Sequence, residues 1–141
     1  MRRRGFSLIE LLIVIAIIAI ITGIAAPNLV REMRGAHETA AISQIRAIHQ
    51  AEAHYYSQFQ RFAQNLGELG PPADLLPPPL VDGKASGYRF SVAGTAQGYN
   101  ISAVPESFGV TGKRTFFSNE TMVIRYNLTA EPATASSPPL Q

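Results

Sequence analysis

The sequence predicts an α+β protein in which a long N-terminal α-helix, a spine, packs on a small antiparallel β-sheet of three or four strands. Residues 6–26 form one apolar run, and the residues after it carry apolar side chains three and four positions apart. The second half of the chain alternates apolar and polar residues in short segments separated by Gly and Pro. A chain of 141 residues, 46% of them apolar, has room for one small domain.

Composition excludes several classes of protein. Twelve basic and ten acidic side chains leave a net charge of +2, which is too even for a dedicated nucleic-acid binder. The absence of Cys removes disulfides, thiolate nucleophiles and Cys-based zinc sites. With no Trp and 9% aromatic residues, the chain is poorly suited to bind bases by stacking.

The apolar run has the length of a membrane span. Of its 21 residues, 17 are apolar, the exceptions being Ser7, Glu10, Thr22 and Gly23. As a helix the run is about 31 Å long, close to the thickness of a bilayer core, whereas a strand needs only about 5 or 6 residues. The basic residues 2–4 hold the N-terminal end in the cytoplasm.

Glu10 helps to decide which kind of segment the apolar run is. A carboxylate in an apolar membrane segment costs about 2.5–3.5 kcal/mol and usually has a partner or a function. A plain membrane anchor gives no reason for it. A cleaved secretory signal usually has a shorter apolar core and a clearer cleavage site than Ala25-Ala26, and a twin-arginine signal usually precedes a less apolar run. A cut between Gly5 and Phe6 would place a new α-amine four residues before Glu10, or beside Glu10 of a second copy. The alternative is a carboxylate that reaches headgroup water.

The segment Gly5-Phe6-Ser7-Leu8-Ile9-Glu10-Leu11-Leu12, with its basic leader, resembles the class III signal of type IV pilins and prepilins. The resemblance implies that a prepilin peptidase removes residues 1–5 as a leader and N-methylates Phe6. It also implies the pilin fold and a homopolymeric filament built by an inner-membrane assembly platform and motor. In that filament Glu10 would pair with the Phe6 amine of a neighbouring subunit.

The spine divides at its glycine and proline. Residues 6–27 are predicted as the transmembrane and filament-core helix, with a helix break at Gly23 and Pro27. In pilins such a segment can melt when subunits pack. Residues 28–62 are the amphipathic half, helical to about Gln58. We expect its apolar side to pack on the sheet and its charged residues to face solvent or neighbours; the apolar side is Ile42, Ile45, Ile48, Tyr55 and Phe59, and the charged residues include Glu38, Glu52 and Arg46.

The remainder of the chain is predicted as a loop, a sheet and a tail. Residues 63–87, rich in Pro and Gly, are a connecting loop unable to sustain a helix or a central strand. Residues 88–129 form the antiparallel sheet of a globular head, with strands expected at 88–92, 99–104, 114–117 and 121–126. Residues 130–141 are expected to be disordered.

No catalytic constellation stands out, so we predict no enzyme, no cofactor and no metal. The three histidines, His37, His49 and His54, lack metal-binding spacing and are expected in solvent or at an interface. A weak calcium site could draw on residues between the strands, namely Asn100, Glu106, Asn119 and Glu120. Three glycosylation-type patterns begin at Asn100, Asn119 and Asn127.

These observations predict the structural subunit of a bacterial type IV pilus. We expect it in the inner membrane before assembly and in an extracellular pilus afterwards. Two alternatives stay open: a secretion pseudopilin forming a short periplasmic pseudopilus, and a membrane-tethered binding module that forms no polymer. Motility, adhesion, DNA uptake and electron transfer are all compatible with the prediction, and contact with nucleic acid is left open.

Overall fold

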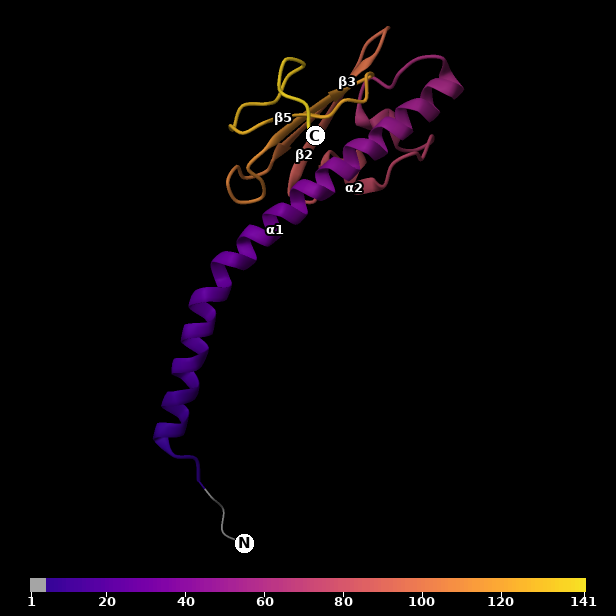
Figure 1. The fold of residues 1–141 in the computed structure, drawn as a ribbon. Helices are drawn as coiled ribbons and strands as arrows, with labels where there is room; N and C mark the ends of the chain where they lie inside the picture. The colour runs from indigo at the N-terminus through magenta and orange to yellow at the C-terminus, as the bar shows by residue number, and fades with distance from the viewer. Residues whose placement is uncertain (1–4) are drawn as a thin grey trace. The chain divides into compact units, whose positions relative to one another are not determined.

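A computed structural model describes residues 5–141, which form two compact units dividing between Met33 and Arg34. The helix α1 (Leu8–Phe59) contributes to both units, and all other elements belong to the second, which we call the head (Figure 1). The basic leader residues 1–4 lie outside the described part of the chain. The α+β prediction of a long N-terminal helix packed on an antiparallel sheet is confirmed.

Helix α1 is continuous through Gly23 and Pro27. The expected helix break is therefore absent from the single chain. Pro27 removes one backbone donor, but side chains on both sides add hydrogen bonds: Thr22 Oγ1 donates to the Ile18 carbonyl at 2.8 Å, and Asn28 Nδ2 to the Ile24 carbonyl at 3.2 Å. Melting of residues 21–28 on filament packing stays a prediction, which amide hydrogen exchange in filaments would check.

The sheet has five antiparallel strands in sequence order, one more than the upper expectation. They are β1 (Lys84–Ala85), β2 (Tyr88–Gly94), β3 (Tyr99–Pro105), β4 (Thr115–Asn119) and β5 (Arg125–Asn127). The strand expected at 121–126 was largely wrong. Met122 adopts a left-handed φ of 63° and its N–H donates to the Asn119 carbonyl, so the chain turns there and only its end pairs with β4.

The connecting segment 63–87 contains more structure than its Pro and Gly content suggested. It holds a 3-10 helix, η1 (Leu66–Leu69), a short helix, α2 (Pro78–Val81), and the edge strand β1. Asn65 Oδ1 accepts the N–H of Glu68 at 3.2 Å and caps η1. Pro78 and Pro79 lie in the first turn of α2. A backbone N–H there has no acceptor within the helix, so the missing proline N–H groups cost no helical hydrogen bond.

The tail was expected to be disordered, and this was wrong. Leu140 N donates to the Ile124 carbonyl at 2.7 Å, and Tyr126 N donates to the Pro138 carbonyl at 3.1 Å. Thr115 Oγ1 of β4 donates to the Glu131 carbonyl, and Ala133 is buried. The tail therefore covers the free edge of β5, which would otherwise present unpaired backbone groups.

The core of the head lies between α1 and one face of the sheet. Ala41, Ile45, Ile48 and Tyr55 of α1 are buried against Tyr88, Phe90, Ile101 and Phe116 of the strands.

Three sequence expectations about α1 are wrong. Glu38 and Glu52 are buried although we placed them at the surface, His49 is buried, and Phe59 is 51% exposed. Helix α1 ends at Phe59, one residue beyond the predicted end, because Gln60 adopts a left-handed φ of 55°.

Candidate functional site: the apolar helix and the head

The first half of α1 presents its apolar side chains to the outside on every face. Large apolar residues from Phe6 to Ile24 are 46–84% exposed. Among residues 5–141, α1 is the one helix long and apolar enough to cross a membrane by length and composition. A contiguous apolar surface of this size requires cover from lipid or from protein.

Glu10 lies in the first turn of this helix, three residues after Ser7. Its Oε2 accepts the backbone N–H of Ser7 at 3.1 Å. A carboxylate at a helix N-terminus satisfies a free N–H and interacts favourably with the helix dipole. Gly5 and Phe6 precede the helix and are exposed. Gly5 and Phe6 thus lie just before α1, and Glu10 lies in its first turn.

Comparison with known proteins finds one matching family profile and two relatives. A family profile described as "Prokaryotic N-terminal methylation motif" matches residues 1–26. The type IV major pilin protein PilA of Myxococcus xanthus is 32% identical over 105 residues, 74% of this chain and 44% of that protein. The type IV wide pilus major component PilA4 of Thermus thermophilus is 35% identical over 78 residues, 51% of this chain and 60% of that protein.

The methylation motif and these two relatives support a type IV pilin or prepilin. Its relatives are named as structural pilus components, so the family is one of structural subunits and not of enzymes. The chain spans about half the length of the curated relatives it matches.

In the head, Glu38 fixes α1 to the segment that leads into β4. Its Oε1 accepts the N–H of Lys113 and its Oε2 accepts Arg114 Nε, both at 2.8 Å. One position earlier, His37 Nδ1 lies 3.3 Å from the Thr111 carbonyl oxygen. Because Glu38 is buried, these charge-assisted hydrogen bonds are internal contacts that hold α1 against the sheet.

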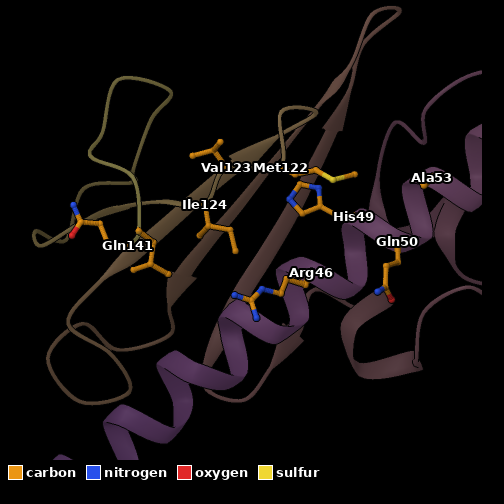
Figure 2. Close-up of a pocket in the computed structure, with 9 residues that line it drawn as sticks. Arg46, His49, Gln50, Ala53, Met122, Val123, Ile124 and Gln141 are labelled. Carbon is orange, nitrogen blue, oxygen red and sulfur yellow. The ribbon is translucent and has the colours of Figure 1, made fainter.

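His49 connects α1 to β3 and β4 (Figure 2). Its Nδ1 lies 2.7 Å from the Tyr99 hydroxyl and its Nε2 lies 2.8 Å from Ser118 Oγ, which itself donates to the Val123 carbonyl. Because the Ser118 hydroxyl already donates its proton, it accepts the N–H of His49 Nε2, and the Tyr99 hydroxyl donates to Nδ1. A neutral imidazole therefore satisfies both ring nitrogens and both hydroxyls. Burial lowers the pKa of His49.

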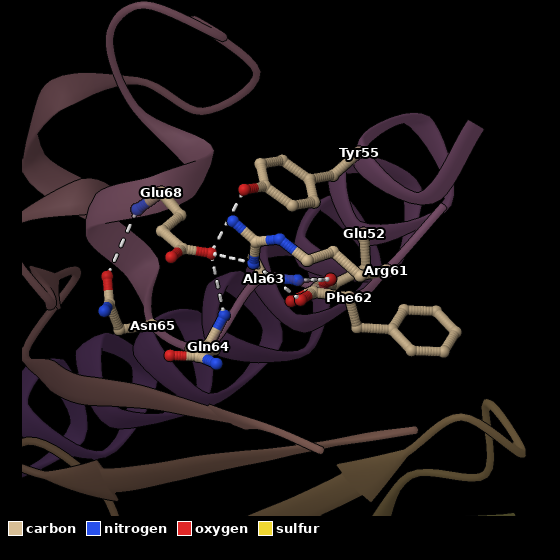
Figure 3. Close-up of polar contacts among 8 residues, drawn as sticks. All are labelled: Glu52, Tyr55, Arg61, Phe62, Ala63, Gln64, Asn65 and Glu68. Carbon is tan, nitrogen blue, oxygen red and sulfur yellow. Dashed lines mark hydrogen bonds and ion pairs between the residues drawn. The ribbon is translucent and has the colours of Figure 1, made fainter. Parts of the chain in front are cut away.

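Glu52 and Glu68 hold the chain where it turns back after α1 (Figure 3). Glu52 is fully buried; its Oε2 accepts the Ala63 N–H at 2.9 Å, and its Oε1 has no hydrogen-bond partner among the described residues. Burial raises the pKa of Glu52 to about 7. Glu68 Oε2 accepts Arg61 Nη1 at 2.8 Å and the Gln64 N–H at 3.0 Å, and these bonds lower the pKa of Glu68.

The other candidate residues do not form a site. Asn100 and Asn119 are cross-strand partners at one end of the β3–β4 pair, whereas Glu106 follows the opposite end of β3. Within residues 5–141, no three His, Asp or Glu side chains gather in a metal-binding group. Asn127 lies on β5, and Asn100 and His54 are exposed.

The buried acids and histidine were missed by sequence reasoning, although the sequence held a signal for them. Glu38 and Glu52 stand three or four residues from Ala41, Ile48 and Tyr55, on the same apolar side of α1. An acid within an apolar stripe is expected to be buried with partners. Those partners lie far along the chain and are not visible in the periodicity.

Proposed function

We propose that this chain is the structural subunit of a type IV pilus. The observation that carries the proposal is the exposed apolar first half of α1, which lipid covers before assembly and other copies cover afterwards. The relatives named as a major pilin and a major pilus component support this function over a pseudopilin or a tethered binding module.

Processing is the first step of the proposed function. A prepilin peptidase cuts between Gly5 and Phe6 and methylates the new amine of Phe6. The exposed, non-helical segment 5–7 supports this step, because a peptidase needs extended backbone that it can reach. The subunit then remains in the inner membrane, held by α1, until the assembly platform and its motor extract it.

Glu10 pairs with the Phe6 amine of a neighbouring subunit in the filament. Among residues 5–141, the hydrogen bond that this carboxylate accepts comes from the local Ser7 N–H, a weak substitute for a cation in an apolar environment. Moving α1 from lipid into a helix bundle gains little from the hydrophobic effect, since lipid already solvates its side chains. The ion pair and close packing therefore favour the filament and set its register.

The deciding experiment is to shear extracellular fibres from cells and determine the N-terminus of the subunit by mass spectrometry. We expect a chain that begins at N-methylated Phe6. Glu10→Gln removes only the charge and is expected to leave processing and membrane level unchanged while lowering fibre yield at least about tenfold, equivalent to about 1.4 kcal/mol. Glu106→Gln, an exposed head carboxylate, is the matched control.

An intact Met1, a cut after Ala26, or processed chains that give no surface fibre would contradict the proposal. If Glu10→Gln gave as many fibres as the wild type, the ion pair would be contradicted but the filament would not.

A further inference from the structure

A groove opens in the head between α1 and the turn that joins β4 to β5 (Figure 2). It has a volume of about 590 Å³. Arg46, His49, Gln50 and Ala53 line it from α1, Met122, Val123 and Ile124 line it from the turn, and Leu140 and Gln141 line it from the tail. Met122 is 60% exposed, and Arg46 has no carboxylate within ion-pair distance among the described residues. The groove therefore offers apolar cover and one free positive charge.

His49 adds no second positive charge to the groove. Both of its ring nitrogens are engaged, by Tyr99 and Ser118, and its pKa is lowered by burial. Arg46 lines the same groove from α1, and the Tyr99 ring on β3 lies 5.5 Å from the His49 ring, centroid to centroid. Arg46 is thus the cation that a ligand in the groove would meet.

A second surface has complementary properties. On α1, Leu29, Glu32 and Met33 follow the spacing that places side chains on one helix face. Leu29 is 61% and Met33 52% exposed, and Glu32 has no ionic partner among the described residues. Ile21, Ala25 and Leu29 line a shallow hollow that continues this face toward the apolar run. We call Leu29, Glu32 and Met33 the post-proline face.

Lipid is a poor cover for the post-proline face. Arg31, Glu32 and Arg34 place three charged residues within four positions, which is costly in a hydrocarbon core. The face is nevertheless continuous with the apolar surface that the proposed filament buries between copies. A protein surface with apolar contacts and one cation fits it better.

We propose that in the filament the post-proline face of one subunit packs into the groove of a second copy, with Glu32 beside Arg46. This inference rests on the proposed pilus function and adds a specific contact between the spine of one subunit and the head of another. Leu29 and Met33 then contact Met122 and Ala53, and the ion pair fixes the register of the contact.

The absence of Cys from the chain makes disulfide trapping a clean test. Fibres built from Met33→Cys/Ala53→Cys are expected to give a ladder of linked subunits on oxidation, because each copy links to the next. Met33→Cys/Ser91→Cys, with its second thiol on exposed β2, is the matched control and is expected to give none. Fibres that form normally yet show no ladder with the first pair would overturn the contact.

Charge reversal tests the ion pair separately. Glu32→Arg and Arg46→Glu are each expected to lower fibre yield about tenfold, while the double variant restores it to within about threefold of the wild type. Processing to Phe6 and membrane level are measured in every strain. Single reversals without effect, or no rescue by the double variant, would contradict the pairing. Failure of the wild-type chain to form fibres would instead contradict the pilus function itself.

Discussion

Glu38, His49 and Glu52 lie on the buried side of α1, where ionisable residues are expensive unless they are paired or neutral. Each of the three residues meets this requirement in a different way. Glu38 binds the Arg114 guanidinium, His49 is neutral between two hydroxyls, and Glu52 accepts one backbone N–H. Glu38 attaches α1 to the segment before β4, His49 attaches it to β3 and β4, and Glu52 attaches it to the returning chain. The protonation of His49 and Glu52 therefore bears directly on how firmly the helix holds the head.

Glu52 makes the stability of the head depend on pH. Burial raises its pKa from 4.5 to about 7, so between these values the folded chain holds a proton that the unfolded chain has released. Its contribution is fully present below pH 4.5 and is lost as the pH rises through about 7. At about 1.4 kcal/mol per pH unit over this shift, the loss is at most about 3.5 kcal/mol.

We expect the pH slope of the free energy of unfolding to flatten in Glu52→Gln, measured by denaturant unfolding of the detergent-solubilised chain. His49 acts in the opposite direction, since its lowered pKa removes stability as the pH falls below 6.5. The wild-type minus variant difference isolates Glu52. Glu106→Gln should keep the wild-type slope, and an unchanged slope in Glu52→Gln would refute the assignment.

At the scale of elements, the tail completes the sheet. Residues 138–140 exchange backbone hydrogen bonds with residues 124–126 at the outer edge, and an isolated bridge joins Arg125 to Pro139. Arg125 Nη1 also donates to the Ser137 carbonyl at 2.8 Å. With no disulfide possible, these bonds and the packing of Ala133 and Leu140 are what retain this region.

Leu140→Ala is expected to lower the free energy of unfolding by about 1–2 kcal/mol, less than the 2–5 kcal/mol typical of a fully buried leucine because Leu140 is only partly buried. Thermal or denaturant unfolding of the full chain measures the change. Leu128→Ala, at an exposed leucine of the same region, is the matched control and should stay near the wild type. Equal stability of the two variants would show that the tail does not hold the edge.

For the whole molecule, the proposed cleavage between Gly5 and Phe6 would change the sign of the net charge. The precursor carries 12 basic and 10 acidic side chains, with a sequence pI of about 9.2. Removal of Arg2, Arg3 and Arg4 leaves 12 − 3 = 9 basic against 10 acidic side chains, a net charge of −1 before the termini are counted. The basic pI is therefore a property of the leader and not of the head.

Isoelectric focusing should place the subunit from sheared fibres on the acidic side of neutrality. Chain expressed in a host without prepilin peptidase should focus near the basic value of the full sequence. The same basic pI for both forms would mean that the leader is retained in the fibre.

The sequence by itself determined the features that depend on local periodicity and length. The apolar run, α1 to within a residue of its end, β2 and β3 followed from patterns that span only a few residues at a time. Membership of the pilin family was also predicted from eight consecutive residues, Gly5 to Leu12, and the basic leader before them. Each of these signals is complete within its own segment.

Only the tertiary structure decided which polar residues are buried and which loops are ordered. Glu38 meets Lys113 and Arg114 across 75 and 76 positions, and His49 meets Ser118 across 69. The turn at Met122 and the ordered tail likewise depend on partners brought close by the sheet. A buried polar group is tolerable only when its partner is present, and long-range partners are set by the fold and not by the neighbouring sequence.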